Sequence, residues 1–167
     1  MKKIIPSFLT ILNLICGCFA IALAFQFQFE AVLILVCLGN FFDFLDGFAA
    51  RALNSVTNFG KHLDSITDVI TSGVVPGVVV FQLFKLSGNK VSDFEVLIFG
   101  YDLTFSLSLI SFIAFLITIG SAIRLSKFNT SIGNDEFIGL PTPANAIFFS
   151  ALPVLINSEL FIESKEI

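Results

Sequence analysis

The sequence predicts an all-α protein that spans a membrane several times as a helical bundle. Hydrophobic residues make up 56% of its 167 residues and the mean hydropathy is +0.95, whereas about 45–50% is usual in soluble domains. Only 13% of the residues are charged, and they are unevenly placed. A soluble protein this apolar would expose large hydrophobic patches and aggregate. We therefore expect a single membrane domain that covers residues 1–167.

Five apolar runs account for the predicted spans, each near the ~20 residues that cross a bilayer. They are residues 5–25, a run from residue 31 into the acidic helix that follows, and residues 69–84, 103–123 and 137–156. The first run follows Lys2 and Lys3 and has the rough form of a secretory signal peptide. Because it is long and contains Pro6 and Asn13, we interpret it as a retained membrane helix.

The basic residues predict how these spans are oriented. If the N-terminus is cytoplasmic, six of the nine Lys and Arg residues fall on the cytoplasmic side: Lys2, Lys3, Arg51, Lys61, Arg124 and Lys127. Such enrichment is the usual bias of membrane proteins. We therefore expect an integral protein of the cell (inner) membrane, with residues 43–68 facing the cytoplasm. A net charge of −4 and the lack of any basic or stacking platform argue against a nucleic-acid partner.

Four aspartates between residues 43 and 68 are the most informative feature of the chain, because charged residues within membrane segments are costly and usually mark function. Helical spacing places two sets of residues on one face each: Asp43, Asp46, Gly47, Ala50 and Arg51, then Gly60, Asp64 and Asp68. Residues 52–59 are expected to form the turn between these two helices. The four carboxylates should therefore converge on a common point.

Converging carboxylates predict a metal site. Four ionised carboxylates at close range repel one another, so a positive charge should lie among them. A set of oxygen ligands without His or Cys suits one or two hard divalent cations such as Mg²⁺, Mn²⁺ or Ca²⁺. Arg51 offers a fork of donors for phosphate oxygens, and Gly47 and Gly60 would let a ligand approach the backbone. This combination indicates phosphoryl-type chemistry, with an aspartate available to deprotonate an attacking hydroxyl.

The same spacing resembles the signature of the CDP-alcohol phosphatidyltransferases. Every fixed position matches, from Asp43-x-x-Asp46-Gly47-x-x-Ala50-Arg51 to Gly60-x-x-x-Asp64-x-x-x-Asp68 after eight residues. The resemblance implies that CDP-diacylglycerol binds with its nucleotide in the cytoplasmic part of a cavity. It implies that the phosphatidyl group is transferred to an alcohol and that CMP is released.

The resemblance also implies individual roles. One or two divalent cations would be held against the pyrophosphate by Asp43, Asp46, Asp64 and Asp68. Asp68 would also be the catalytic base that takes the proton from the incoming hydroxyl. Gly47 and Gly60 would admit the nucleotide, and Arg51 would bind phosphate or position the aspartates.

Three further stretches resemble the phosphatidylserine synthase branch of that family, which uses L-serine as the acceptor. They are residues 5–17, 122–129 and 137–144. Ser7 stands where Asn is more usual, and Ser126-Lys127 stands where Ala-Arg is usual. The branch implies that Asn13 and Arg124 bind substrate, with Arg124 at the serine carboxylate. An ordinary anchor at a helix end is an equally good interpretation of Arg124.

Other functions remain compatible with the sequence. The same enzyme class could use glycerol phosphate or inositol phosphate, although these acceptors would call for more basic residues near the cavity. A small cation transporter could also use intramembrane aspartates, but it would spread them towards both faces. Relatives generally carry at least one more membrane helix after the fifth. Either the chain is truncated or a partner subunit supplies that wall, and we expect a homodimer in contact with membrane lipid.

Overall fold

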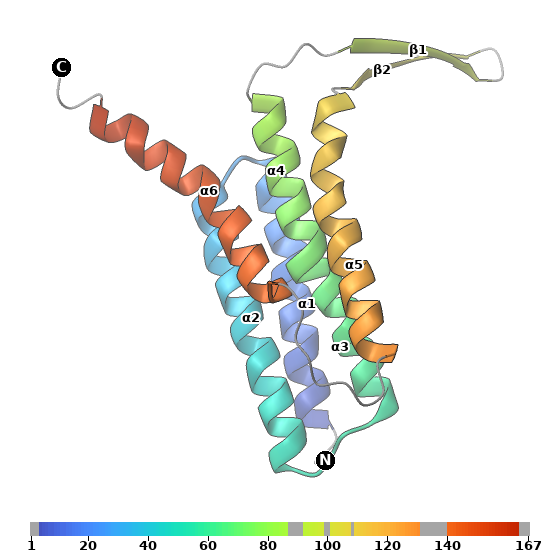
Figure 1. Ribbon diagram of the computed structural model, residues 1–167, viewed down its shortest axis with the longest axis vertical. Coiled ribbons are helices and arrows are strands. Elements are labelled where there is room, and N and C mark those ends of the chain that lie inside the picture. The colour runs from blue at the N-terminus through green and yellow to red at the C-terminus, as the bar shows by residue number, and fades with distance from the viewer. Residues whose placement is uncertain (1–3, 87–91, 99–100, 108, 131–139, 164–167) are drawn as a thin grey trace.

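The computed structural model describes residues 4–86, 92–98, 101–107, 109–130 and 140–163. Its elements follow one another in this order: α1 (Ile4–Phe25), α2 (Phe29–Ala52), α3 (Asn58–Val69), the π-helical η1 (Ile70–Val74), α4 (Val75–Leu86), β1 (Ser92–Ile98), β2 (Tyr101–Leu107), the 3-10 helix η2 (Leu109–Ala114), α5 (Phe115–Thr130) and α6 (Thr142–Glu163). The helices run side by side as a bundle, and α6 leans away from it towards the C-terminus (Figure 1).

Three helical segments are long and apolar enough to cross a membrane. They are α1, α2 and the continuous rod of α3, η1 and α4, which runs over Asn58–Leu86. A shorter apolar stretch, Thr142–Ile156, belongs to α6. The structure thus confirms the predicted fold class, a bundle of membrane helices.

Small residues fill the core of the bundle. The buried cluster consists of Ala20 and Ala24 from α1, Val32 and Val36 from α2, Val75, Val78 and Val79 from α4, and Ala146 from α6. Large apolar side chains such as Phe8, Phe19 and Phe44 are instead exposed. Helices in lipid pack closely through small residues, since burying bulky apolar groups gains little there. This distribution is therefore the one expected of a bundle surrounded by acyl chains.

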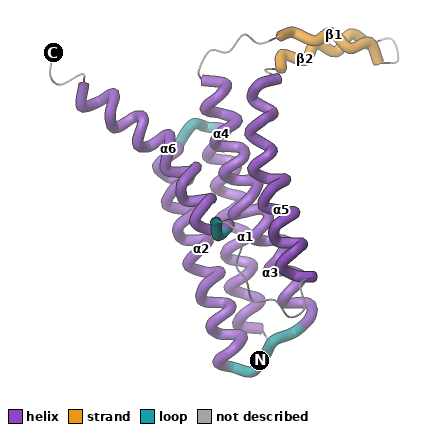
Figure 2. The backbone as a smooth tube through the Cα atoms, viewed as in Figure 1, coloured by secondary structure: helices purple, strands orange, loops and turns teal. Residues whose placement is uncertain are grey.

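The fourth predicted span differs from the structure. Residues 103–107 were expected to begin a membrane helix, but they belong to β2, which pairs antiparallel with β1. Figure 2 shows this hairpin beyond the ends of α4 and α5. Polar and apolar residues alternate from Asp102 to Leu107, a period of two that is typical of strands. Counting apolar residues alone conceals this alternation. Helical structure begins at Leu109 and continues to Thr130, beyond the predicted end at Ile123.

Two other predicted boundaries shift as well. The turn between α2 and α3 is shorter than predicted, because α2 continues to Ala52 and α3 begins at Asn58. Asn54 adopts a left-handed backbone conformation in this turn, with φ of 48°, which Asn tolerates better than most residues. The last helix begins at Thr142, while residues 137–139 of the predicted run lie outside the described residues.

Candidate active site

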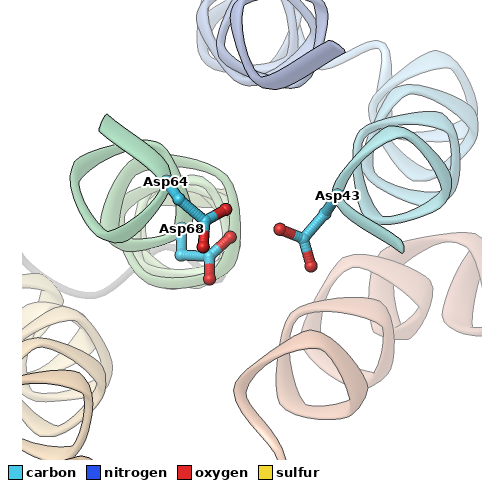
Figure 3. Close-up of side chains that lie close together, drawn as sticks. All are labelled: Asp43, Asp64 and Asp68. Carbon is cyan, nitrogen blue, oxygen red and sulfur yellow. The ribbon is translucent and has the colours of Figure 1, made fainter. Parts of the chain in front are cut away.

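Three of the four predicted aspartates meet between α2 and α3. Figure 3 shows Asp43 on α2 facing Asp64 and Asp68 on α3. One carboxylate oxygen from each of the three lies within 4.8 Å of the others. Asp64 and Asp68 are four residues apart and therefore project from one face of α3. The helical spacing in the sequence accounts for the face of each helix that carries the aspartates, and both helices pack against α1, which brings these faces together.

Asp46 is held differently from the other three. Its Oδ2 accepts a hydrogen bond of 2.6 Å from Thr10 Oγ1 on α1, and only 6% of Asp46 is exposed. Thr10 is itself buried, and its Oγ1 also lies 3.1 Å from the Pro6 carbonyl oxygen. Sequence reasoning did not select Thr10 as a site residue. The available signal was a hydroxyl one helical turn before Asn13 within an apolar run.

A cavity of about 470 Å³ opens beside these aspartates. It is lined by Pro6, Ser7 and Thr10 of α1, by Asp43, Phe44, Asp46, Gly47, Ala50 and Arg51 of α2, and by Ser55, Val56, Thr57, Gly60, Lys61, Asp64 and Asp68. Seven of the nine predicted site residues are therefore in its wall. Asn13 and Arg124 are not.

Two cations and two glycines shape the cavity. The cations are Arg51 and Lys61, which line the cavity and carry the charge opposite to that of the aspartates. Both side chains are exposed. Arg51 Nε donates a 3.0 Å hydrogen bond to the Gly47 carbonyl, which holds the guanidinium over that glycine. A Cβ placed on Gly47 would lie 3.9 Å from the Arg51 guanidinium, and one on Gly60 would lie 3.1 Å from Thr57 Oγ1. Glycine at both positions therefore leaves room for a ligand near the backbone.

Arg124 lines a second cavity, of about 360 Å³, between α5 and α6. Its other polar lining residues are Ser121, Thr142 and Asn145. The α5 helix that forms one wall of this cavity packs against the rod that carries Asp68, since Thr118 Oγ1 of α5 donates a 2.9 Å hydrogen bond to the Gly73 carbonyl of η1. A Cβ on Gly73 would lie 3.2 Å from Ser121 Cβ. Asn13, which lines neither cavity, lies within α1 and is buried, with only 1% of the residue exposed.

The sequence pattern of the CDP-alcohol phosphatidyltransferases matches residues 3–163. The chain belongs to this family. The resemblance noted in the sequence is thereby confirmed.

Curated relatives carry serine-specific names. A CDP-diacylglycerol--serine O-phosphatidyltransferase of Bacillus subtilis is 33% identical over 83% of the chain, and one of Methanocaldococcus jannaschii is 35% identical over 96%. An archaetidylserine synthase of Methanothermobacter thermautotrophicus is 31% identical over 88% of the chain. The chain spans 69%, 66% and 56% of these three relatives.

CDP-alcohol phosphatidyltransferases depend on divalent metal in general, and the cluster of three aspartates fits this requirement. Asp64 Oδ1 is buried and has no hydrogen-bond partner among the described residues. A buried carboxylate oxygen without a partner is costly unless a positive charge compensates it. The oxygen-only ligands suit a hard cation such as Mg²⁺ or Mn²⁺.

Proposed function

We propose that the protein is a phosphatidylserine synthase, which transfers the phosphatidyl group of CDP-diacylglycerol to the hydroxyl of L-serine and releases CMP. The observation that carries this proposal is the convergence of Asp43, Asp64 and Asp68 in one cavity with Arg51 and Lys61. The names of the similar synthases support serine as the acceptor. The chain spans about two thirds of the length of these two synthases.

In the first cavity, Asp43, Asp46, Asp64 and Asp68 would hold one or two Mg²⁺ or Mn²⁺ ions. Divalent cations at such a site neutralise charge on the pyrophosphate and on the departing phosphate. Arg51 and Lys61, which line the same cavity, would bind the phosphate oxygens. Gly47 and Gly60 would let the nucleotide lie against the backbone.

Asp68 is the proposed catalytic base. It would take the proton from the serine hydroxyl as that oxygen forms a bond to the phosphorus of the phosphatidyl group. The bond from this phosphorus to the bridging oxygen of CMP breaks, and CMP leaves with that oxygen. Asp68 lies near the end of α3, and Gly73 of the following η1 lies against Ser121, which lines the second cavity; this proximity supports a role for Asp68 between the two substrates.

We propose the second cavity as the acceptor site. Arg124 can bind the serine carboxylate with two parallel hydrogen bonds, and Ser121, Thr142 and Asn145 are neutral hydrogen-bonding residues. Arg124 is the only cation in this wall of described residues. A phosphorylated acceptor such as glycerol phosphate or inositol phosphate would need more positive charge. The charge of the wall therefore favours serine. Asn13, which lines neither cavity, would act on substrate only indirectly.

The location and assembly of the protein are also proposals. The distribution of Lys and Arg supports an orientation in the cell membrane with the first cavity open to the cytoplasm. Apolar side chains such as Phe41 and Phe148 are exposed on the described helices, and they would pack against lipid or against a second copy in a homodimer. Chemical cross-linking in membranes would detect the dimer.

A CMP-release assay tests the proposed reaction. The purified protein is incubated with CDP-diacylglycerol and Mg²⁺ or Mn²⁺, in separate reactions with L-serine, glycerol phosphate and inositol phosphate. Release of CMP with serine alone, lost on adding EDTA, is the expected result. Release of CMP with a phosphorylated acceptor but not with serine would overturn the proposal that serine is the acceptor. Metal-independent release would overturn the role of the aspartates.

A further inference from the structure

Segments of α1, α2 and η1 meet about one helical turn away from the acidic cluster. Gly39 precedes Asp43 by four residues on α2, and Thr71 follows Asp68 by three residues in η1. Residues spaced by three or four lie on one face of a helix. Asn13 of α1 completes this junction. The junction therefore adjoins both helices whose aspartates must approach each other.

Glycine allows the three segments to come close. A Cβ placed on Gly39 would lie 2.8 Å from Asn13 Oδ1 and 2.9 Å from Thr71 Cγ2. One placed on Gly17 of α1 would lie 2.8 Å from Thr71 Oγ1. Atoms do not pack at such distances, so a methyl group at either position would displace the Asn13 or Thr71 side chain or move the segments apart. The close approach of α2 to η1 thus depends on Gly39, and that of α1 to η1 depends on Gly17.

The junction is polar although it is buried. Asn13 and Thr71 are each 1% exposed. Both amide atoms of Asn13 and the hydroxyl of Thr71 have no hydrogen-bond partner among the described residues. Apolar residues of similar size would pack there without this cost, so the polar atoms call for an explanation other than stability. Thr71 also lies in a π-helical segment, and such segments are frequent at functional sites.

We propose that Asn13 and Thr71, packed against Gly39 and Gly17, are positioning residues that set the separation of Asp43 from Asp68. Gly39 fixes how closely α2 approaches the rod that carries Asp68. The Asn13 amide and the Thr71 hydroxyl supply unpaired hydrogen-bonding groups at the junction, which a bridging water can connect to the carboxylates. The affinity of the site for a divalent cation therefore depends on this junction. This inference rests on the proposed metal-binding role of the aspartates.

Binding of Mn²⁺ to the detergent-purified full chain, measured by electron paramagnetic resonance without substrates, tests the proposal. Gly39→Ala should weaken Mn²⁺ affinity by about tenfold or more, since changes behind metal ligands commonly cost 10–100-fold. Thr71→Val keeps the shape of the side chain and removes the hydroxyl, so it should also weaken binding. Thr71→Ser keeps the hydroxyl and should remain within about twofold of the wild type.

Two controls separate positioning from general damage. Val79→Ala removes buried volume from the apolar core, so it should lower the unfolding temperature and leave Mn²⁺ affinity unchanged. Leu38→Ala changes an exposed neighbour of Gly39, so it should alter neither the unfolding temperature nor the Mn²⁺ affinity. Wild-type affinity in Gly39→Ala would overturn the proposal. If that variant does not fold, equal Mn²⁺ affinity in Thr71→Val and Thr71→Ser would overturn it.

The outcome is distinguishable from failure of the proposed reaction. If the wild-type protein binds Mn²⁺ but releases no CMP with serine, the proposed reaction is overturned and the positioning role is unaffected. Wild-type protein that binds no Mn²⁺ would overturn both.

Discussion

The two cavities of the bundle are built in contrasting ways. The first takes all four of its aspartates from a single stretch, residues 43–68, that folds into two consecutive helices. The second combines α5 with the beginning of α6, on either side of residues 131–139, and contains one cation, Arg124, among its described residues. Because its aspartates come from one short stretch, the acidic part of the first site can be recognised from helical spacing. A site made of separate helices depends on how those helices pack.

The contrast also suggests a division of labour. The acidic cavity carries groups that suit a cation, a pyrophosphate and a proton transfer. The second cavity carries a cation and neutral polar groups that suit a small carboxylate. Substitutions in the first cavity should therefore affect metal binding and turnover, whereas substitutions in the second should affect the KM for serine.

The largest effect is expected from Asp68→Asn, which keeps the shape of the side chain and removes the base. Loss of a general base costs roughly 10²–10⁴-fold, so serine-dependent CMP release should fall by about 10³-fold. Binding of CDP-diacylglycerol should persist in part, because the other three aspartates remain. Rates measured under saturating serine check this outcome. Activity within tenfold of the wild type would remove Asp68 from the chemical step.

Helical spacing predicted the faces of α2 and α3 that carry Asp43, Asp64 and Asp68, because the face of each helix is fixed by its own sequence. That these faces meet also requires both helices to pack against α1. The contact of Thr10 with Asp46 could not be predicted in this way. It joins residues 36 positions apart on different helices, and nothing in the spacing of either helix specifies the partner. The strand β2 was missed for another reason, since its apolar residues were counted without their alternation.

The junction behind the aspartates marks a further limit of sequence reasoning. The resemblance implies that Asn13 binds substrate, and the structure places it within α1, buried and outside the walls of both cavities. Gly39 resembles any other glycine in a membrane helix until its distance from Asn13 is known. The π-helical turn at Thr71 has no clear signal in the sequence. Each of these features arises from packing between helices rather than from the pattern of one helix.

The second cavity is probed by Arg124→Gln. A hydrogen bond to a charged group contributes about 1.5–3 kcal/mol, so the loss of this contact should raise the KM for serine by about 10–100-fold. Mn²⁺ affinity should not change, because Arg124 lies outside the acidic cavity. Arg124→Lys is the matched control, since it keeps the charge without the two-pronged geometry, and its KM should lie between the other two. An unchanged KM for serine in Arg124→Gln would identify Arg124 as a simple anchor.

A smaller effect is expected in the first cavity from Thr10→Val. This change removes the hydroxyl that donates to Asp46 while preserving the shape of the side chain. Metal affinity and turnover should fall by about tenfold, as for other hydrogen-bond partners of ligating carboxylates. Thr10→Ser should keep most of the metal affinity and turnover, because serine retains the hydroxyl that donates to Asp46. Equal behaviour of the Val and Ser variants would show that Asp46 does not need this bond.

The smallest effect is expected from His62→Ala. His62 follows Lys61 on α3, two residues before Asp64, but its side chain is exposed and is not part of the cavity wall. Exposed residues without such contacts usually change stability by less than about 0.5 kcal/mol, so CMP release should stay within about twofold of the wild type. Lys61→Ala is the matched comparison on the same turn, because Lys61 does line the cavity, and it should raise the KM for CDP-diacylglycerol. If His62→Ala raised the KM for CDP-diacylglycerol as much as Lys61→Ala does, lining the cavity would not explain the effect of Lys61. If neither variant raised this KM, Lys61 would not bind the substrate.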